Sequence, residues 1–321
     1  AASDVYKRQI LAVSLLALVA CTPEKKQEAD YSQYVNPMIG TDFTGNTYPG
    51  AQVPFGMVQL SPDNGLPGWD RISGYFYPDT TIAGFSHTHL SGTGAGDLYD
   101  ISFMPVTRPY KEAPAPLGIY STFSHNDEAA SAGYYRVLLK DYNINVELTA
   151  TERCGIQRYT FPEAEASVFL NLKKAMNWDF TLDSKIEVVD STTIRGYRLS
   201  QGWSPLQHVY FETRFSKPFV ACHMDTTSIV TKEKGWIGTA YVARFDFNTK
   251  KDEEILVTTG ISGVSMEGAG KNLRAEAPKD DFDYYQAQAS ANWNRQLSKI
   301  EVKSRNTCLL YTSPSPRDVE E

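Results

Sequence analysis

Cysteine is scarce in this chain, with four residues in 321, and Cys308 falls in a terminal segment that we set aside below. Two of the others, Cys154 and Cys222, could pair in an oxidising compartment, but two cysteines make no disulfide framework and buried thiols are the favoured interpretation. Basic residues are also fewer than acidic ones: the chain has 31 Lys and Arg residues and 38 Asp and Glu residues, which gives a formal net charge of −7. This balance argues against a nucleic-acid partner, which would require a basic face.

The sequence has no apolar run long enough to cross a bilayer as a helix. The stretch ILAVSLLALVAC (10–21) is about a dozen residues, whereas a spanning helix takes about 20, so it fits the apolar region of a signal peptide. Its last four residues, LVAC, match a lipobox, which predicts that Cys21 carries a lipid and that residues 22–30 form a polar tether. We therefore expect a lipid-anchored protein of the bacterial cell envelope, in the periplasm or at the outer membrane surface. A plain secretory signal with a coincidental cysteine is the alternative.

Both ends of the chain look foreign to the protein. Residues 1–9 and 308–318 resemble translations of a transposase adapter used to build sequencing libraries, so we treat 1–9 and 308–321 as artefacts. We accordingly expect a gene fragment whose native part runs from about residue 10 to 307.

The middle of the chain consists of short runs rich in β-branched and aromatic residues, separated by turn residues. Many of these runs alternate polar with apolar side chains, which is typical of an antiparallel β-sandwich. The clearest is HVYFETRF, with Val209, Phe211, Thr213 and Phe215 on one face. The runs are 134–140, 144–150, 156–161, 167–172, 193–199, 208–215, 236–247 and 254–260. We predict a mainly β domain over 31–262.

After Gly263 the pattern changes to helical periodicity. Apolar residues recur at steps of three and four from Phe282 to Leu297, and Asp280 and Asp281 stand where an N-cap is expected. We predict a helical linker over 263–307 that leads to a further domain.

The segment Gly68–Pro105 carries the functional signal, because it crowds Trp, Tyr, His and Asp residues among glycines. In GWDRISGYFY, the flat ring of Trp69 lies beside Asp70 and Arg71, the combination with which proteins bind sugars: the aromatic face packs on the ring's CH face and the polar groups bind its hydroxyls. Trp69 could instead belong to the core, but its neighbours are poor core formers.

His87 and His89, two residues apart, would share one face of a strand. They could contact sugar hydroxyls, they could be structural histidines bonded to the backbone, or they could bind zinc with a third ligand such as Asp97. The acidic residues Asp70, Asp97 and Asp100 are candidates for the carboxylate pair of a glycosidase, although no spacing identifies an acid or a base. The run GTGAG (92–96) lacks the features of a phosphate-binding loop and is interpreted as a tight turn.

Several long motifs resemble the N-terminal domain of family 92 glycoside hydrolases, the calcium-dependent exo-acting α-mannosidases of bacteria. They are YVNPMIGT (34–41), PGAQVPFGMVQLSPD (49–63), GYFYPDTTIAGFSHTHLSGTGAGDLYDISFMP (74–105), GYYRVLL (133–139) and RYTFP (158–162). The resemblance implies a galactose-mutarotase-like β-sandwich joined through helices to an (α/α)6 barrel, and we expect that barrel to be missing from this fragment.

What the resemblance implies for function is the inverting hydrolysis of terminal α-mannosides of N-glycans or mannans. The catalytic acid and base and most calcium ligands would lie in the barrel, so we expect this chain alone to be inactive. The sandwich would line the leaving-group side of a mannose pocket, with Trp69 as the main contact and Asp70, His87 and His89 as weaker candidates. The expected partners are a mannose-containing glycan, the barrel in cis and, through the lipid, a membrane.

Two alternatives remain. The sandwich could act as a stand-alone carbohydrate-binding module, or the protein could serve glycoprotein catabolism as a relative of glycopeptide amidases. The second has little support, because Cys154 and Cys222 lack the surroundings of an activated thiolate.

Overall fold

The computed structural model describes residues 30–173, 177–231 and 236–300. The fold below is that of the unit that begins at Tyr31. The predicted signal peptide, the lipid site Cys21 and both adapter-like ends lie outside the described residues. None of the helices in the described ranges has the length and apolar character needed to cross a membrane.

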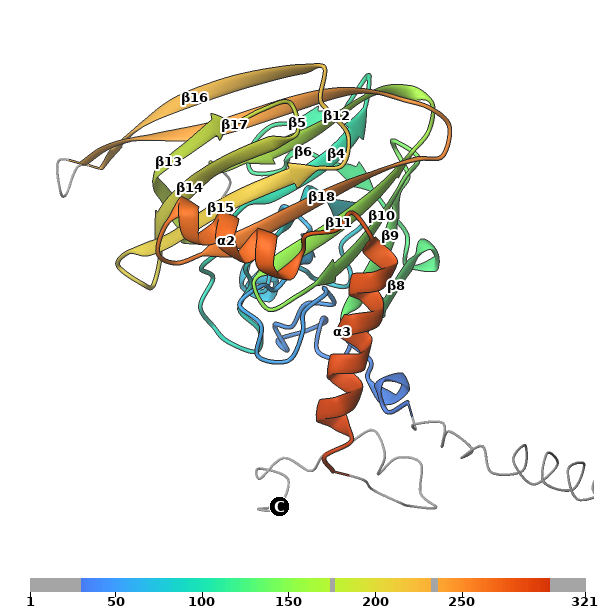
Figure 1. The fold of residues 1–321 in the computed structure, drawn as a ribbon. Coiled ribbons are helices and arrows are strands. Elements are labelled where there is room, and N and C mark those ends of the chain that lie inside the picture. Colours follow the sequence, from blue (N-terminus) through green and yellow to red (C-terminus); the bar gives the residue numbers. More distant parts are fainter. Residues whose placement is uncertain (1–29, 174–176, 232–235, 301–321) are drawn as a thin grey trace, which may run out of the picture. The chain divides into compact units, whose positions relative to one another are not determined.

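Two antiparallel sheets face each other, as Figure 1 shows, and confirm the predicted β-sandwich. The six-stranded sheet has the order β1 (Ser61–Asp63), β3 (Gly84–Ser86), β4 (Ser102–Thr107), β12 (Ala164–Asn171), β17 (Trp236–Thr249) and β16 (Ala221–Thr231). The eight-stranded sheet has the order β13 (Phe180–Val188), β14 (Thr193–Gln201), β15 (Gln207–Phe215), β18 (Glu253–Ser262), β11 (Cys154–Phe161), β10 (Ile144–Ala150), β9 (Tyr134–Leu139) and β8 (Glu128–Ser131).

Shorter strands and turns complete the fold. They are the strand pairs β2 (Thr81–Ile82) with β7 (Ser121–Thr122) and β5 (Glu112–Ala113) with β6 (Gly118–Ile119), and the 3-10 turns η1 (Ser32–Tyr34), η2 (Trp69–Arg71) and η3 (His125–Asp127).

The core fills the space between the two sheets, as the alternation of polar and apolar residues predicts. On β15, Val209, Phe211, Thr213 and Phe215 are all buried, which confirms their expected common face. The Phe215 ring reaches across to the six-stranded sheet, where its centroid lies 5.2 Å from that of Phe245. Aromatic rings at this separation stabilise a core beyond the area they bury.

Two helices cover the outer face of the eight-stranded sheet. They are α2 (Met266–Glu276), which packs on β15 and β18, and α3 (Phe282–Leu297), which packs on β9, β10 and β11 (Figure 1). The predicted N-cap of α3 is confirmed, because the Asp281 carboxylate accepts a hydrogen bond from the backbone N–H of Tyr284 at 3.0 Å. Under the helices lies a second apolar cluster, made of Cys154, Ile156, Leu256, Leu273, Ala277, Phe282 and Tyr285.

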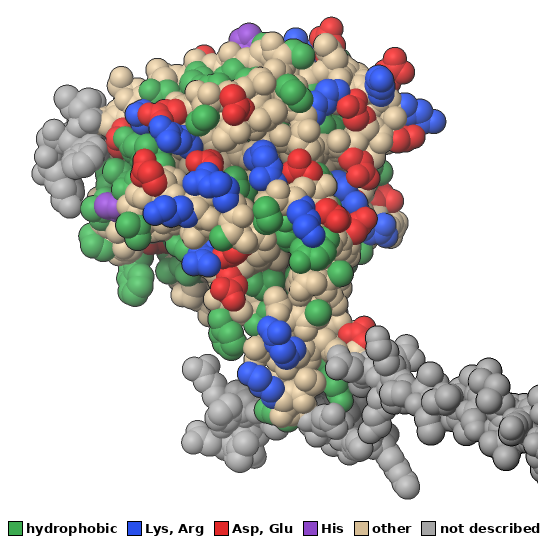
Figure 2. Space-filling model, viewed as in Figure 1, with side chains coloured by type: hydrophobic (Ala, Val, Ile, Leu, Met, Phe, Trp, Pro, Cys, Tyr) green, Lys and Arg blue, Asp and Glu red, His purple; other side chains and the backbone are tan. Residues whose placement is uncertain are grey.

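Acidic and basic side chains are interspersed over this outer face, and Figure 2 shows no large area of one sign there. The chain's negative balance is therefore not concentrated into a charged patch on this face.

Candidate functional site

The Trp69 side chain is held at the protein surface on a turn that its neighbours fix. It lies in η2 with 61% of its surface exposed, and Asp70 beside it is exposed as well. The next residue, Arg71, donates two hydrogen bonds to the Asp79 carboxylate at 2.5 and 2.6 Å. Such a bidentate pair restricts the turn without using the indole. The prediction that Trp69 is exposed agrees with the structure, while its contact with sugar stays a prediction.

Two further tryptophans lie on loops, and one of them, Trp178, lies beside this turn. The Trp178 ring centroid is 6.2 Å from that of Trp69, with 31° between the ring planes. Trp203 is 82% exposed and sits on the loop between β14 and β15. Sequence reasoning missed both, although each has the neighbours that marked Trp69, since Asn177, Asp179, Gly202 and Ser204 are poor core formers. We refer to Trp69, Trp178 and Trp203 as the tryptophan surface.

The loop 92–97 contacts all three segments that carry these tryptophans. Gly94 packs against the Trp69 ring, and a Cβ on Gly96 would lie 2.7 Å from the Cβ of Asn177. The Asp97 carboxylate accepts hydrogen bonds from the backbone N–H groups of Trp203 and Ser204, at 2.8 and 2.9 Å. The glycines of GTGAG therefore allow close packing between loops, in keeping with a structural interpretation of this run.

The two histidines lie in the interior rather than at the tryptophan surface. β3 ends at Ser86, so His87 and His89 do not sit within a strand, and the expectation of a shared strand face was wrong. The His87 side chain is fully buried, its Nδ1 bonds the carbonyl oxygen of Ile101 at 2.8 Å, and burial lowers its pKa to about 4. His89 bonds the carbonyl oxygen of Gln59 through Nδ1. Buried rings with backbone partners match the structural alternative among the three, and direct contact with a sugar would need these rings to be exposed.

A zinc site at this pair is not supported by the geometry. His89 Nε2 lies 2.9 Å from an oxygen of Asp63, but Asp97, the proposed third ligand, uses its oxygens for Trp203, Ser204 and Gln207. Across the described ranges, no group of three or more His, Cys, Asp or Glu side chains is arranged to hold a metal ion.

The three acidic candidates for glycosidase chemistry divide into one exposed and two buried carboxylates. Asp97 and Asp100 are buried and accept hydrogen bonds, so neither is placed to protonate a leaving group. Only Asp70 of the three faces solvent. Their burial and hydrogen bonds thus indicate structural roles for Asp97 and Asp100.

A buried ion-pair network supports the same end of the molecule, and sequence reasoning missed it. Arg198 is fully buried and binds Asp100 at 2.7 Å and Asp179 at 2.6 Å. Burial raises the pKa of Asp179 to about 6, although the Arg198 charge acts in the opposite direction. Asp179 also accepts the backbone N–H of Leu98, which has a positive φ of 83°. Arg198 consequently ties the loop that ends at Asp100 to the loop that carries Trp178.

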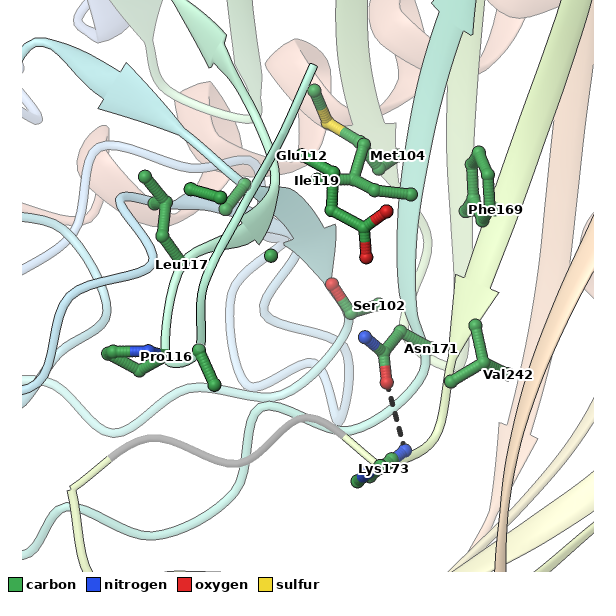
Figure 3. Close-up of a pocket in the computed structure, with 14 residues that line it drawn as sticks. Ser102, Met104, Glu112, Pro116, Leu117, Ile119, Phe169, Asn171, Lys173 and Val242 are labelled. Atoms are coloured by element: carbon green, nitrogen blue, oxygen red, sulfur yellow. Dashed lines mark hydrogen bonds between the residues drawn. The ribbon is translucent and has the colours of Figure 1, made fainter. Parts of the chain in front are cut away.

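A cavity of about 380 Å³ lies elsewhere, between the β5–β6 hairpin and the outer face of the six-stranded sheet. In Figure 3, Met104, Phe169 and Val242 come from the sheet, while Pro116 and Leu117 come from the hairpin. None of the predicted sugar contacts Trp69, Asp70, His87 and His89 lines this cavity.

Both cysteines of the described part are free thiols, and Cys154 is buried. Burial raises the pKa of Cys154 to about 12, so the thiol stays protonated at neutral pH. A nucleophilic cysteine requires a lowered pKa, so the geometry gives no support to amidase chemistry.

Comparison with known proteins places the chain among the glycoside hydrolases. Residues 34–262 match the family model described as glycosyl hydrolase family 92 N-terminal domain, and residues 268–313 match that of the family's catalytic domain. The first match covers most of the chain, so the chain belongs to glycosyl hydrolase family 92, as the motifs predicted.

Similar solved structures come from the same family. The chain is 36% identical to the family 92 α-mannosidase BT3965 from Bacteroides thetaiotaomicron, with a TM-score of 0.78 over 87% of this chain and 39% of that one. That enzyme has also been solved in complex with mannoimidazole. The inverting mannosidase BT2199 of the same organism is 26% identical, with a TM-score of 0.73 over 90% of this chain and 39% of that one.

A curated relative is described as an uncharacterized secreted glycosidase of Arthroderma benhamiae. It is 23% identical over 90% of this chain and 41% of its own length. The chain therefore spans about two fifths of the length of the proteins it matches.

Proposed function

We propose that the protein to which this chain belongs is an exo-acting α-mannosidase that hydrolyses terminal α-mannosides of N-glycans or mannans with inversion. In this proposal the sandwich lines the leaving-group side of the sugar pocket. The observation that carries it is the exposed ring of Trp69 in a chain of family 92 that resembles solved α-mannosidases at 36% identity. An indole face binds the apolar CH face of a pyranose, so Trp69 can orient the sugar that departs.

Inverting hydrolysis requires one carboxylic acid to protonate the leaving oxygen and one carboxylate to activate water. We assign neither role to Asp97 or Asp100, because both carboxylates are engaged inside the protein. The acid and the base are expected in the part of the protein that this chain does not include.

Calcium is predicted by the family resemblance, and the described residues contain no group of three or more His, Cys, Asp or Glu side chains arranged to hold a metal ion. We therefore assign it no step in the reaction on this chain. Calcium dependence stays a prediction for the full-length protein.

The test is hydrolysis of α-mannobiose by the full-length protein, with and without a calcium chelator. We expect activity that the chelator abolishes, and a loss of about tenfold in kcat/KM for Trp69→Ala, corresponding to about 1.4 kcal/mol of transition-state binding. Val220→Ala, which trims another exposed apolar side chain, is the control. Inactivity on every mannoside, whether or not chelator is present, would contradict the proposal.

The exposed tryptophans also fit a stand-alone carbohydrate-binding module. That alternative predicts that residues 31–303 alone bind mannose and that Trp69→Ala weakens the binding. We expect no heat in titration calorimetry, because half a pocket buries little of a ligand. Measurable heat would favour the module.

For location, we propose lipid attachment at Cys21 in the cell envelope. The lipobox motif and the similarity to a secreted glycosidase of Arthroderma benhamiae support export of the protein. Cys21→Ser should move the protein from the membrane fraction to the soluble fraction, and unchanged fractionation would contradict the anchor.

A further inference from the structure

Trp178 presents a second indole face beside Trp69. The two ring centroids lie 6.2 Å apart with 31° between the planes, and Trp178 keeps 41% of its surface exposed. A tryptophan that served only the core would be largely buried, because its side chain is the largest apolar group available to a core. Trp69 and Trp178 together form a continuous exposed aromatic area instead.

The residue before Trp178 fixes it to the Trp69 turn. The Asn177 side-chain oxygen accepts the backbone N–H of Gly68 at 2.8 Å, and its amide nitrogen donates to the Arg71 carbonyl at 3.4 Å. Asn177 has a positive φ of 55°, a conformation that asparagine tolerates better than most residues. One amide therefore sets the spacing of both tryptophans.

The residue after Trp178 is fixed as well. Asp179 bonds Arg198 at 2.6 Å through one oxygen and the Leu98 backbone N–H at 3.0 Å through the other. Trp178 is therefore flanked by two residues, Asn177 and Asp179, whose side chains are hydrogen-bonded within the protein. A ligand that stacks on a preorganised ring loses little affinity to ordering of the protein.

We propose that Trp178 binds the sugar residue that follows the leaving-group sugar, so that the protein prefers α-mannosides of three or more residues over disaccharides. This inference rests on the proposed function, in which Trp69 contacts the leaving-group sugar. The indole of Trp178 then packs on the CH face of the next pyranose, as Trp69 does on the one before it. Two successive sugars of the glycan thus pack on the neighbouring rings of Trp69 and Trp178.

The test compares α-mannotriose with α-mannobiose of the same linkage, using the full-length protein. For Trp178→Ala we expect kcat/KM on mannotriose to fall about five- to tenfold further than kcat/KM on mannobiose, so that the preference for the longer substrate is lost. Trp178→Phe keeps an aromatic face and should retain most of the mannotriose activity. A variant that loses activity equally on both substrates, or that melts several degrees lower, would show that Trp178 serves packing and would overturn the inference.

A binding measurement separates this inference from the proposed reaction. Tryptophan fluorescence titration with the same two sugars does not depend on hydrolysis. Tighter binding of mannotriose that disappears in Trp178→Ala supports the inference even where no hydrolysis occurs, in which case only the proposed reaction fails. Equal affinity of the wild-type protein for both sugars would overturn the inference.

Discussion

The Trp69 turn and the His87–His89 segment lie within twenty-one residues of each other in sequence, yet the structure gives them opposite environments. Trp69 is 61% exposed, while both histidines are buried among backbone carbonyls and aromatic rings. Both segments have the aromatic, polar and glycine-rich composition that suggested a sugar site. The difference teaches that this composition marks an end of the sandwich where loops pack closely, and that only some of its polar groups reach solvent.

The largest effect should come from the buried network that supports the loops. Arg198→Met leaves the carboxylates of Asp100 and Asp179 without their shared partner in the interior. We expect the free energy of unfolding to fall by about 3–5 kcal/mol, measured by urea denaturation. The matched control is Arg195→Met on the same strand, whose exposed pair with Glu187 should matter little. Equal losses for the two variants would contradict a structural role of the buried network.

The next effect tests the link between the glycine loop and Trp203. Asp97→Asn replaces a carboxylate that accepts two backbone N–H groups and the Gln207 amide. Charge-assisted hydrogen bonds of this kind predict a loss of about 1.5–3 kcal/mol in chemical denaturation. Asp70→Asn, at an exposed carboxylate, should change the unfolding free energy by less than about 0.5 kcal/mol.

The buried histidine should make stability depend on pH. The pKa of His87 is about 4 in the folded protein and about 6.5 when unfolded, so the unfolded chain binds more protons in between. Stability from this group is therefore full above pH 6.5 and falls as the pH drops towards 4, by about 2 kcal/mol between pH 7 and pH 5. The titration of Asp179, whose pKa is raised, acts in the opposite direction over the same range, so the test is the difference between wild type and variant.

That difference is measured by urea unfolding at pH 7 and pH 5 for wild type and His87→Gln. The variant should lack the acid-dependent loss, whereas His208→Gln, at an exposed histidine, should keep it. The same pH dependence in wild type and His87→Gln would show that His87 is not the group responsible.

The smallest effect on stability should come from the exposed ring. Trp69→Ala removes a side chain with most of its surface in water, so the unfolding free energy should change by about 0.5 kcal/mol or less. A loss of several kcal/mol would show that Trp69 contributes to packing as the buried histidines do. The two segments would then not differ in the way the exposure of Trp69 indicates.

Strands with one buried face could be predicted from the sequence, because apolar and polar side chains alternate along them with a period of two residues. The runs at 144–150 and 208–215 agree with β10 and β15 to within a residue. The edge strand β16 was missed, because most of its side chains over 221–229 are exposed on both faces and leave no alternation to read. The strand β13 was missed as well, although Thr181, Leu182, Ser184 and Ile186 are buried along it.

The site was only partly predictable for a related reason. Trp69 could be assigned to the surface from its neighbours, and the same criterion applied to Trp178 and Trp203 would have found them. The sequence left the burial of His87 as one of three alternatives, because its hydrogen-bond partner Ile101 lies fourteen residues away and meets it only when β3 and β4 pair. Arg198 in a regular strand looked like any solvent-facing arginine until the fold placed two carboxylates around it.

The two helices pack on the sandwich although most of their residues belong to the match with the family's catalytic domain. The catalytic-domain match begins at residue 268, inside α2, yet Leu273 and Phe282 cover Cys154 and Ile156 of the sandwich. A recombinant domain cut after Ser262 would leave that apolar face open to water and prone to self-association. Dissection of this protein should therefore end beyond Leu297, where the second helix has finished covering the sheet.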